Sequence, residues 1–386
     1  MRKNVKGFEI KHVILIIIVT AIITSITTGV ILINRNRLLF GSSGLLNDSG
    51  INEFVKVYNS LENNYYGDFN KNEIIDAAIK GMLDYLGEDY STYLNQEETD
   101  NLAEELRGQY KGIGISITEG NKIVKVFDNT PAKRVGIEEN DLITNVNGTD
   151  TAGLSQVEIV NLIDKTKENV IEVDRNGEKH TYHITPESIN YPLTRTILEN
   201  NTGYIRIETF SNTVGEEFKK AYSELENKNM TSLIIDLRSN SGGLLKGAAE
   251  IANIFLEKGK VIYYLESKGK KEVLKDNTDE AKNIPIIVLV NEGTASASEV
   301  LAAALKESYG ATLVGKTTYG KGRVQQTKKL EDGSMVKYTT ALWLTPSEEC
   351  IDEFGIQPDY DVQLEKNEEG LYEDTQLQKA EELLTR

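Results

Sequence analysis

The sequence is short of the side chains that bind metals and form disulfides. Its one cysteine, Cys350, excludes an internal disulfide and a multi-cysteine zinc site, and we expect it to be a small packing residue. Six prolines in 386 residues exclude collagen-like and proline-rich stretches. The three histidines are His12, His180 and His183. This scarcity restricts which side chain can act as a general base.

Charge is distributed unevenly along the chain. The formal net charge is −17, yet residues 1–37 hold six basic side chains against the single acid Glu9. The rest of the chain is therefore strongly acidic. An acidic surface repels phosphate backbones, so we expect no nucleic-acid partner.

One long apolar run lies near the N-terminus. Residues 13–33 contain no charged side chain over 21 positions, which is enough for a helix that crosses a bilayer. Four basic residues precede the run, so the positive-inside rule predicts a cytoplasmic N-terminus and an extracytoplasmic body. The alternative is a cleaved signal peptide, but its apolar region is usually only ~7–15 residues long.

The remaining chain changes pattern twice. Residues 51–107 have apolar residues at helical spacing, with Asn72 as a candidate helix cap. Short β-type runs with the turn dipeptides Asn147-Gly148 and Asn176-Gly177 follow up to about residue 186. Beyond residue 203 strands and helices alternate, which predicts an α/β core ending in a short C-terminal helix.

Two strand-to-helix junctions in this core are candidate parts of a catalytic site. Val290 to Glu299 runs from a buried-looking strand into a helix and carries Ser296 and Ser298. Backbone amides at a helix N-terminus suit the oxyanion of acyl transfer, although a serine there can also be a simple helix cap. The second junction, residues 236–243, ends in a glycine pair that permits close backbone approach or merely connects two elements.

A serine nucleophile needs a proton acceptor. No histidine occurs in the α/β core, and His180 and His183 alternate on one strand of the preceding β region. A buried lysine with a lowered pKa is the remaining option. Lys321, between two glycines in residues 319–326, is the best candidate, and an ordinary solvated lysine is the alternative.

The sequence resembles the carboxyl-terminal processing proteases, also called tail-specific proteases. The segments that carry the resemblance span nearly the whole body: GMLDYLGEDYSTYL (81–94), YKGIGISI (110–117), PAKRVGIEENDLITNVNG (131–148), DLRSNSGG (236–243), GTASASE (293–299), YGKGRVQQ (319–326) and GIQPD (355–359). The resemblance implies an α/β protease core of ClpP/crotonase-like fold with an inserted, mostly β PDZ domain. The implied organisation is a cytoplasmic stub and anchor (1–34), a tether (35–50), a helical module (51–107), the PDZ domain (108–187), the serine protease core (188–370) and a C-terminal helix (371–386).

The resemblance also assigns site residues. The family's serine and lysine lie 25 positions apart, which selects Ser296 with Lys321, and Gln325 corresponds to the glutamine that orients the lysine. A straight strand would separate residues 321 and 325 by ~13 Å, so the chain must curl there. The backbone amides of Gly242, Gly243 and Ala297 correspond to the oxyanion hole. The carboxylate-binding loop of the PDZ domain corresponds to Gly112, Ile113, Gly114 and Ile115.

These assignments imply a membrane-anchored serine endopeptidase that cleaves unstructured C-terminal tails of exported proteins. No metal or organic cofactor is required, and the family implies a homodimer. The alternative is a catalytically silent PDZ scaffold that binds C-termini without cutting them. Two departures from the family concern Ile163 to Glu168, which lacks the usual arginine, and Pro346 to Glu349, which replaces Pro-Ser-Gly-Arg.

Overall fold

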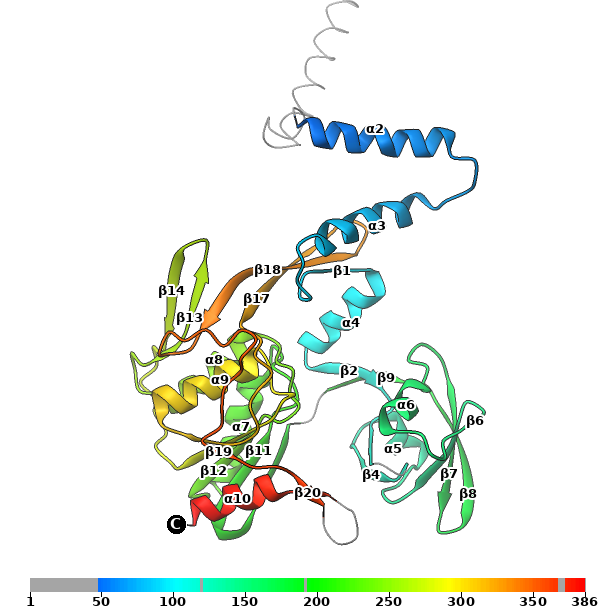
Figure 1. Ribbon diagram of the computed structural model, residues 1–386. Helices are drawn as coiled ribbons and strands as arrows, with labels where there is room; N and C mark the ends of the chain where they lie inside the picture. The colour runs from blue at the N-terminus through cyan, green and yellow to red at the C-terminus, as the bar shows by residue number, and fades with distance from the viewer. Residues whose placement is uncertain (1–47, 119–120, 191–192, 367–371, 386) are drawn as a thin grey trace, which may run out of the picture. The chain divides into compact units, whose positions relative to one another are not determined.

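The computed structural model describes residues 48–118, 121–190, 193–366 and 372–385 (Figure 1). The chain divides into two compact units, residues 1–78 and 79–386. Within the described residues no helix is both long and apolar enough to span a membrane. The predicted anchor, residues 13–33, and most of the tether lie outside the described residues.

Helices dominate the N-terminal part, as the periodicity predicts. Helix α2 (Ser49–Asn64) begins after Asp48, whose carboxylate accepts the N–H of Gly50 at 2.8 Å. Helix α3 (Lys71–Asp84) begins two residues earlier than expected, and Asn70, not Asn72, provides the side-chain oxygen at its start. Helix α4 (Gln96–Leu106) has a capping box made by Asn95 and Glu98.

The expected small β domain forms between residues 109 and 190. A four-stranded sheet has the order β6-β5-β7-β8, and the pairs β3-β4 and β2-β9 flank it. The elements are β2 (Gln109–Gly112), β3 (Ile115–Ile117), β4 (Ile123–Val126), α5 (Pro131–Val135), β5 (Leu142–Val146), β6 (Thr149–Asp150), α6 (Gln156–Asn161), β7 (Asn169–Arg175), β8 (Glu178–Ile184) and β9 (Glu187–Asn190).

Both turn dipeptides are confirmed, since Asn147, Gly148, Asn176 and Gly177 all have positive φ. His183 lies on β8, exposed, with Nδ1 3.1 Å from Glu168. His180 lies on the same strand, so the two histidines share one strand outside the α/β core, as the sequence predicts.

The α/β core is built on a six-stranded sheet of order β10-β11-β12-β15-β16-β19. β10 (Thr194–Ile197) is antiparallel to β11 (Thr202–Arg206), and the other neighbours, β12 (Ser232–Asp236), β15 (Ile286–Val290), β16 (Thr312–Gly315) and β19 (Tyr360–Asp361), pair in parallel. Every residue of β12 and β15 is buried, as the continuous apolar runs predict.

Helices cover both faces of this sheet. Ile235 and Val288 point to the larger core, which they share with α7 (Val214–Glu226), α8 (Leu245–Phe255) and α9 (Ala297–Ala303). The alternate residues Ile234, Ile287 and Leu289 pack on the other face with Ala380 of α10 (Thr375–Leu384). The predicted C-terminal helix thus completes the core.

A second sheet of five strands contains β13 (Val261–Ser267), β14 (Lys270–Lys275), β17 (Arg323–Lys329), β18 (Met335–Leu344) and β1 (Thr92–Leu94). Strand β1 precedes the PDZ-like domain and pairs with β18, Thr92 lying opposite Lys337. The helical pattern of residues 51–107 gave no sign of this strand. Cys350 is exposed, so its predicted role as a packing residue is wrong.

Candidate active site

Ser296 lies between the buried strand β15 and the start of helix α9. Its backbone has φ 57° and ψ −118°, a conformation that side-chain-bearing residues rarely adopt and that costs about 1–3 kcal/mol. Ser298, the other serine of this turn, is fully buried and its hydroxyl donates to the carbonyl of Asn240 at 2.9 Å. Ser296 is half-buried. Ser296 is therefore the serine of this pair that a substrate can reach.

A buried carboxylate joins this serine turn to the lysine turn. Glu299 is fully buried, and its Oε2 accepts the N–H of Ser296 at 2.8 Å and the N–H of Lys321 at 2.9 Å. Its Oε1 accepts the N–H of Gly320 at 2.8 Å and the hydroxyl of Thr318 at 2.6 Å. Burial raises the pKa of Glu299, against the effect of these four donors. One side chain thus fixes the backbones of both candidate catalytic residues.

Lys321 is half-buried just before strand β17. The indole Nε1 of Trp343 donates to its carbonyl at 2.9 Å, and its Nζ lies 4.9 Å from the centre of the Tyr90 ring. Among the described residues, Nζ has no hydrogen-bond partner. Burial lowers the pKa of Lys321, and repulsion from Lys337 adds to the effect. This is the direction that a lysine acting as a base requires.

The carboxylates near the lysine act in the opposite sense. Glu299 and Glu88 both favour the charged ammonium, but the balance leaves the pKa of Lys321 below its ordinary value.

Gln325 lies on β17 where the pairing with β18 shifts register, between Val324 and Gln325. This irregularity is the departure from a straight strand that its assigned role requires. In this structure its Nε2 donates to the hydroxyl of Thr339 at 3.3 Å and not to Lys321.

The two glycines assigned to the oxyanion hole lie against the serine turn. A Cβ at Gly242 would be 2.8 Å from the Cβ of Ser296 and 3.0 Å from the N of Ala297. The N–H of Gly242 donates to Oδ1 of Asn240 at 2.9 Å, whereas the N–H groups of Gly243 and Ala297 have no acceptor within the described residues. The sequence-distant junctions at 236–243 and 290–299 therefore form one site.

Three family models match the chain: Peptidase family S41 at residues 201–362, the activating protease CtpB N-terminal domain at residues 40–99, and the PDZ domain at residues 102–173. The chain is 37% identical over 358 residues to carboxy-terminal processing protease CtpA of Bacillus subtilis (strain 168), an alignment that covers 90% of this chain and 76% of the relative. It belongs to the carboxy-terminal processing proteases of family S41.

Two further comparisons agree with this assignment. A probable CtpA-like serine protease of Staphylococcus aureus (strain MRSA252) is 36% identical, with 91% of this chain and 72% of the relative covered. The solved photosystem II D1 C-terminal processing protease is 26% identical, with a TM-score of 0.51 over 82% of this chain and 89% of that one. The chain is therefore a serine-type C-terminal processing protease with a PDZ domain.

The PDZ loop of the protease has the geometry of an amide-lined turn. Gly114 has φ +87° and approaches Thr130 so closely that a Cβ would lie 2.2 Å from the threonine Cβ. Ile113 is buried, and its carbonyl accepts the N–H of Ala132 at 2.9 Å. The N–H groups of Ile113 and Gly114 find no acceptor in the part of the chain that the structure describes.

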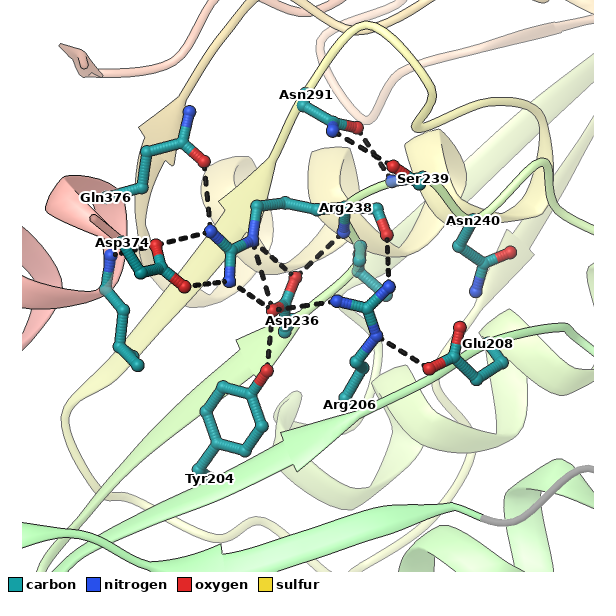
Figure 2. A network of polar contacts seen from close by, with 12 residues as sticks. Tyr204, Arg206, Glu208, Asp236, Arg238, Ser239, Asn240, Asn291, Asp374 and Gln376 are labelled. Carbon is teal, nitrogen blue, oxygen red and sulfur yellow. Dashed lines mark hydrogen bonds and ion pairs between the residues drawn. The ribbon is translucent and has the colours of Figure 1, made fainter. Parts of the chain in front are cut away.

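An ion-pair network at the end of β12 supports the glycine loop of the protease (Figure 2). The guanidinium of Arg238 lies between two carboxylates, 2.6 Å from Asp236 and 2.6 Å from Asp374. Asp236 is fully buried and also accepts the hydroxyl of Tyr204 at 2.6 Å. Since Asp374 caps α10, the network connects the C-terminal helix to the strand end that precedes Gly242.

Sequence reasoning missed Glu299, Arg238 and Tyr90 as parts of this site. Each of the three contacts a residue at least 19 positions away: Glu299 binds Thr318, Arg238 binds Asp374, and Tyr90 lies over Lys321. Glu299 and Arg238 also make local contacts, with Ser296 and Asp236. The only sequence signal for Glu299 was its place three residues after the serine, a position typical of a capping box. No group of three or more His, Cys, Asp or Glu side chains gathers as a metal site among the described residues.

Proposed function

We propose that Ser296 is the nucleophile and Lys321 the general base of a Ser-Lys dyad that cleaves C-terminal tails of exported proteins. The observation that carries the proposal is the Glu299 carboxylate, which binds the backbone N–H of both residues. The lowered pKa of Lys321 supports the same roles.

The proton transfers follow from these assignments. Neutral Nζ of Lys321 accepts the proton of Ser296 Oγ as this oxygen attacks the scissile carbonyl. The resulting ammonium gives the proton to the leaving amine, and water then hydrolyses the acyl-enzyme with Lys321 again as base. Gln325 takes part by orienting Nζ. To do so, its side-chain amide must release the hydroxyl of Thr339 and hydrogen-bond to Nζ of Lys321 instead.

The oxyanion of the tetrahedral intermediate needs donors next to Ser296. The N–H groups of Gly243 and Ala297 are available for this role. Gly242 serves mainly by its lack of a side chain, since its own N–H already donates to Asn240 in this structure. Removing one such donor typically costs about 10²–10³-fold in kcat.

The dyad is tested with Ser296→Ala and Lys321→Ala in a cleavage assay on a fluorescently labelled, unfolded casein. Both variants should lose at least about 100-fold in kcat/KM, because a general base typically contributes about 10²–10⁴-fold. Lys316→Ala is the matched control because this lysine is ion-paired to Asp361 at the surface and should leave cleavage unchanged. Full activity in Lys321→Ala would reject the dyad, and tail binding without cleavage by the unsubstituted protein would favour a scaffold.

Tail recognition is assigned to the PDZ loop, residues 112–115. Its free backbone amides suit a terminal carboxylate, and an extended tail can add to the adjacent sheet edge. The Ser296→Ala protein should bind an unstructured peptide with a free carboxyl terminus at least tenfold more tightly than the same peptide amidated. Equal binding of the two peptides would overturn this assignment without touching the dyad.

We also propose that residues 13–33 anchor the protease in the cytoplasmic membrane and leave the catalytic domain outside. The uncharged 21-residue run and the preceding basic residues support this orientation. The protein should remain in membranes after a high-salt wash, whereas release with a new N-terminus would indicate a cleaved signal peptide. Homodimerisation is a further expectation from the family, which sedimentation velocity of the purified protein tests.

A further inference from the structure

The loop between α3 and β1 places an aromatic ring on the candidate base. The centre of the Tyr90 ring is 4.9 Å from Nζ of Lys321 and 5.9 Å from Cζ of Arg323. Tyr90 is half-buried. This residue comes from the segment before the PDZ domain, more than 200 positions away in sequence.

Several polar contacts hold this loop in place. Glu88, whose side chain is 9% exposed, accepts the hydroxyl of Thr339 at 2.8 Å and pairs with Arg323 at 3.2 Å. Ser91 donates to Glu88 and accepts the N–H of Thr339 at 3.1 Å. The pairing of β1 with β18 continues these contacts. Tyr90 therefore sits on a loop fixed at both sides and not on a free end.

We propose that Tyr90 is a positioning residue for Lys321: its ring covers the amine, keeps water from Nζ and so favours the neutral form that accepts the serine proton. This inference rests on the proposed dyad. It gives the segment before the PDZ domain a role in catalysis.

The phenol itself is not the base. Burial raises the pKa of Tyr90 to about 12, so the hydroxyl stays protonated at physiological pH. A ring over an amine has two opposing effects, because excluding water disfavours the ammonium while the π face attracts it. The charged groups around Nζ are Lys337 on β18, Arg323 on β17, Glu299 on α9 and Glu88 in the loop.

Three substitutions separate these effects. Tyr90→Phe keeps the ring, Tyr90→Leu keeps apolar cover without a π face, and Tyr90→Ala removes both. The readout is the pH profile of kcat/KM for casein cleavage by the full-length protein between pH 6 and pH 10. Because activity requires the neutral lysine, cleavage rises with pH through the pKa of Lys321, and a raised pKa moves this limb to higher pH.

We expect the acid limb of Tyr90→Ala to move up by about one pH unit, with about tenfold less cleavage at pH 7. Tyr90→Phe should keep the limb of the unsubstituted protein, and Tyr90→Leu, which loses the attraction of the π face for the ammonium, should keep it or move it to lower pH. Asp89→Ala is the matched control, since Asp89 is the exposed neighbour in the same loop. Circular dichroism of each variant monitors folding.

Three results would overturn the inference. The first two concern a folded Tyr90→Ala protein, namely an acid limb that stays in place or one that moves to lower pH. The third is a shift in Tyr90→Leu equal to that in Tyr90→Ala. Failure of the dyad itself has a different signature, namely that Lys321→Ala retains cleavage. The two ideas are therefore tested separately in one assay.

Discussion

Replacing Gly242 by alanine adds a single methyl group at the closest approach of the glycine loop to the serine turn. The new Cβ would lie 2.8 Å from both the carbonyl oxygen of Ala295 and the Cβ of Ser296, with φ at +108°. Two of its three nearest neighbours are backbone atoms, which cannot rotate away. The loop or the serine must therefore move.

The cost has two parts. The positive φ costs an alanine about 1–3 kcal/mol, and forcing a methyl into a packed site costs about 1–3 kcal/mol more. We expect Gly242→Ala to lower the free energy of unfolding by about 2–6 kcal/mol. Displacement of Ser296 or of the neighbouring oxyanion donors should lower kcat/KM by about 10²–10³-fold.

Gly259→Ala is the control. Gly259 also has positive φ, +90°, but a Cβ there meets no atom within 4 Å. The Gly259→Ala protein should lose only the free energy of unfolding that comes from placing an alanine at positive φ, and it should retain cleavage within about twofold. Urea unfolding and casein cleavage measure the two quantities. Normal cleavage by Gly242→Ala, or an equal loss of cleavage in Gly259→Ala, would refute the reasoning.

Two further predictions concern buried carboxylates. Glu299→Gln leaves at least one backbone N–H without an acceptor, so urea unfolding should show a loss of about 1–3 kcal/mol, and unchanged stability would contradict the bridging role. Asp236→Asn should cost about 3–5 kcal/mol because Arg238 loses its fully buried partner, and Asp374→Asn about 1–2 kcal/mol because Asp374 is 40% exposed. Burial would raise the pKa of Asp374, but hydrogen bonds from Arg238 hold it below its usual value. The stabilisation that Asp374 provides is therefore present above about pH 4 and is lost on further acidification. Because Asp374→Asn lacks this carboxylate, it should lose less stability below about pH 4 than the unsubstituted protein does. An acid-unfolding curve of that variant parallel to the unsubstituted protein would contradict this.

The sequence predicts best those features that depend on neighbouring residues. Buried strands such as β12 follow from continuous apolar runs, and the Asn-Gly turns follow from the conformational freedom of those two residues. The C-terminal helix begins at Thr375, within the predicted segment 371–386, because its cap, Asp374, is local.

The features that escaped prediction depend on contacts across the sequence. Strand β1 is three residues long and is defined by its partner β18, not by its own composition. Three of the four bonds to Glu299, and the ring of Tyr90 over Lys321, arise only when distant segments meet. Cys350 was misplaced because composition says little about exposure of a single small residue.

The antiparallel pair β2-β9 has a consequence for how such enzymes diversify. Gln109 faces Asn190 across this ribbon, so the chain enters and leaves the PDZ domain at adjacent points. A module whose two ends meet can be exchanged for another without stretching the polypeptide on either side. Evolution can therefore alter which tails are captured while the machinery that cuts them stays as it is.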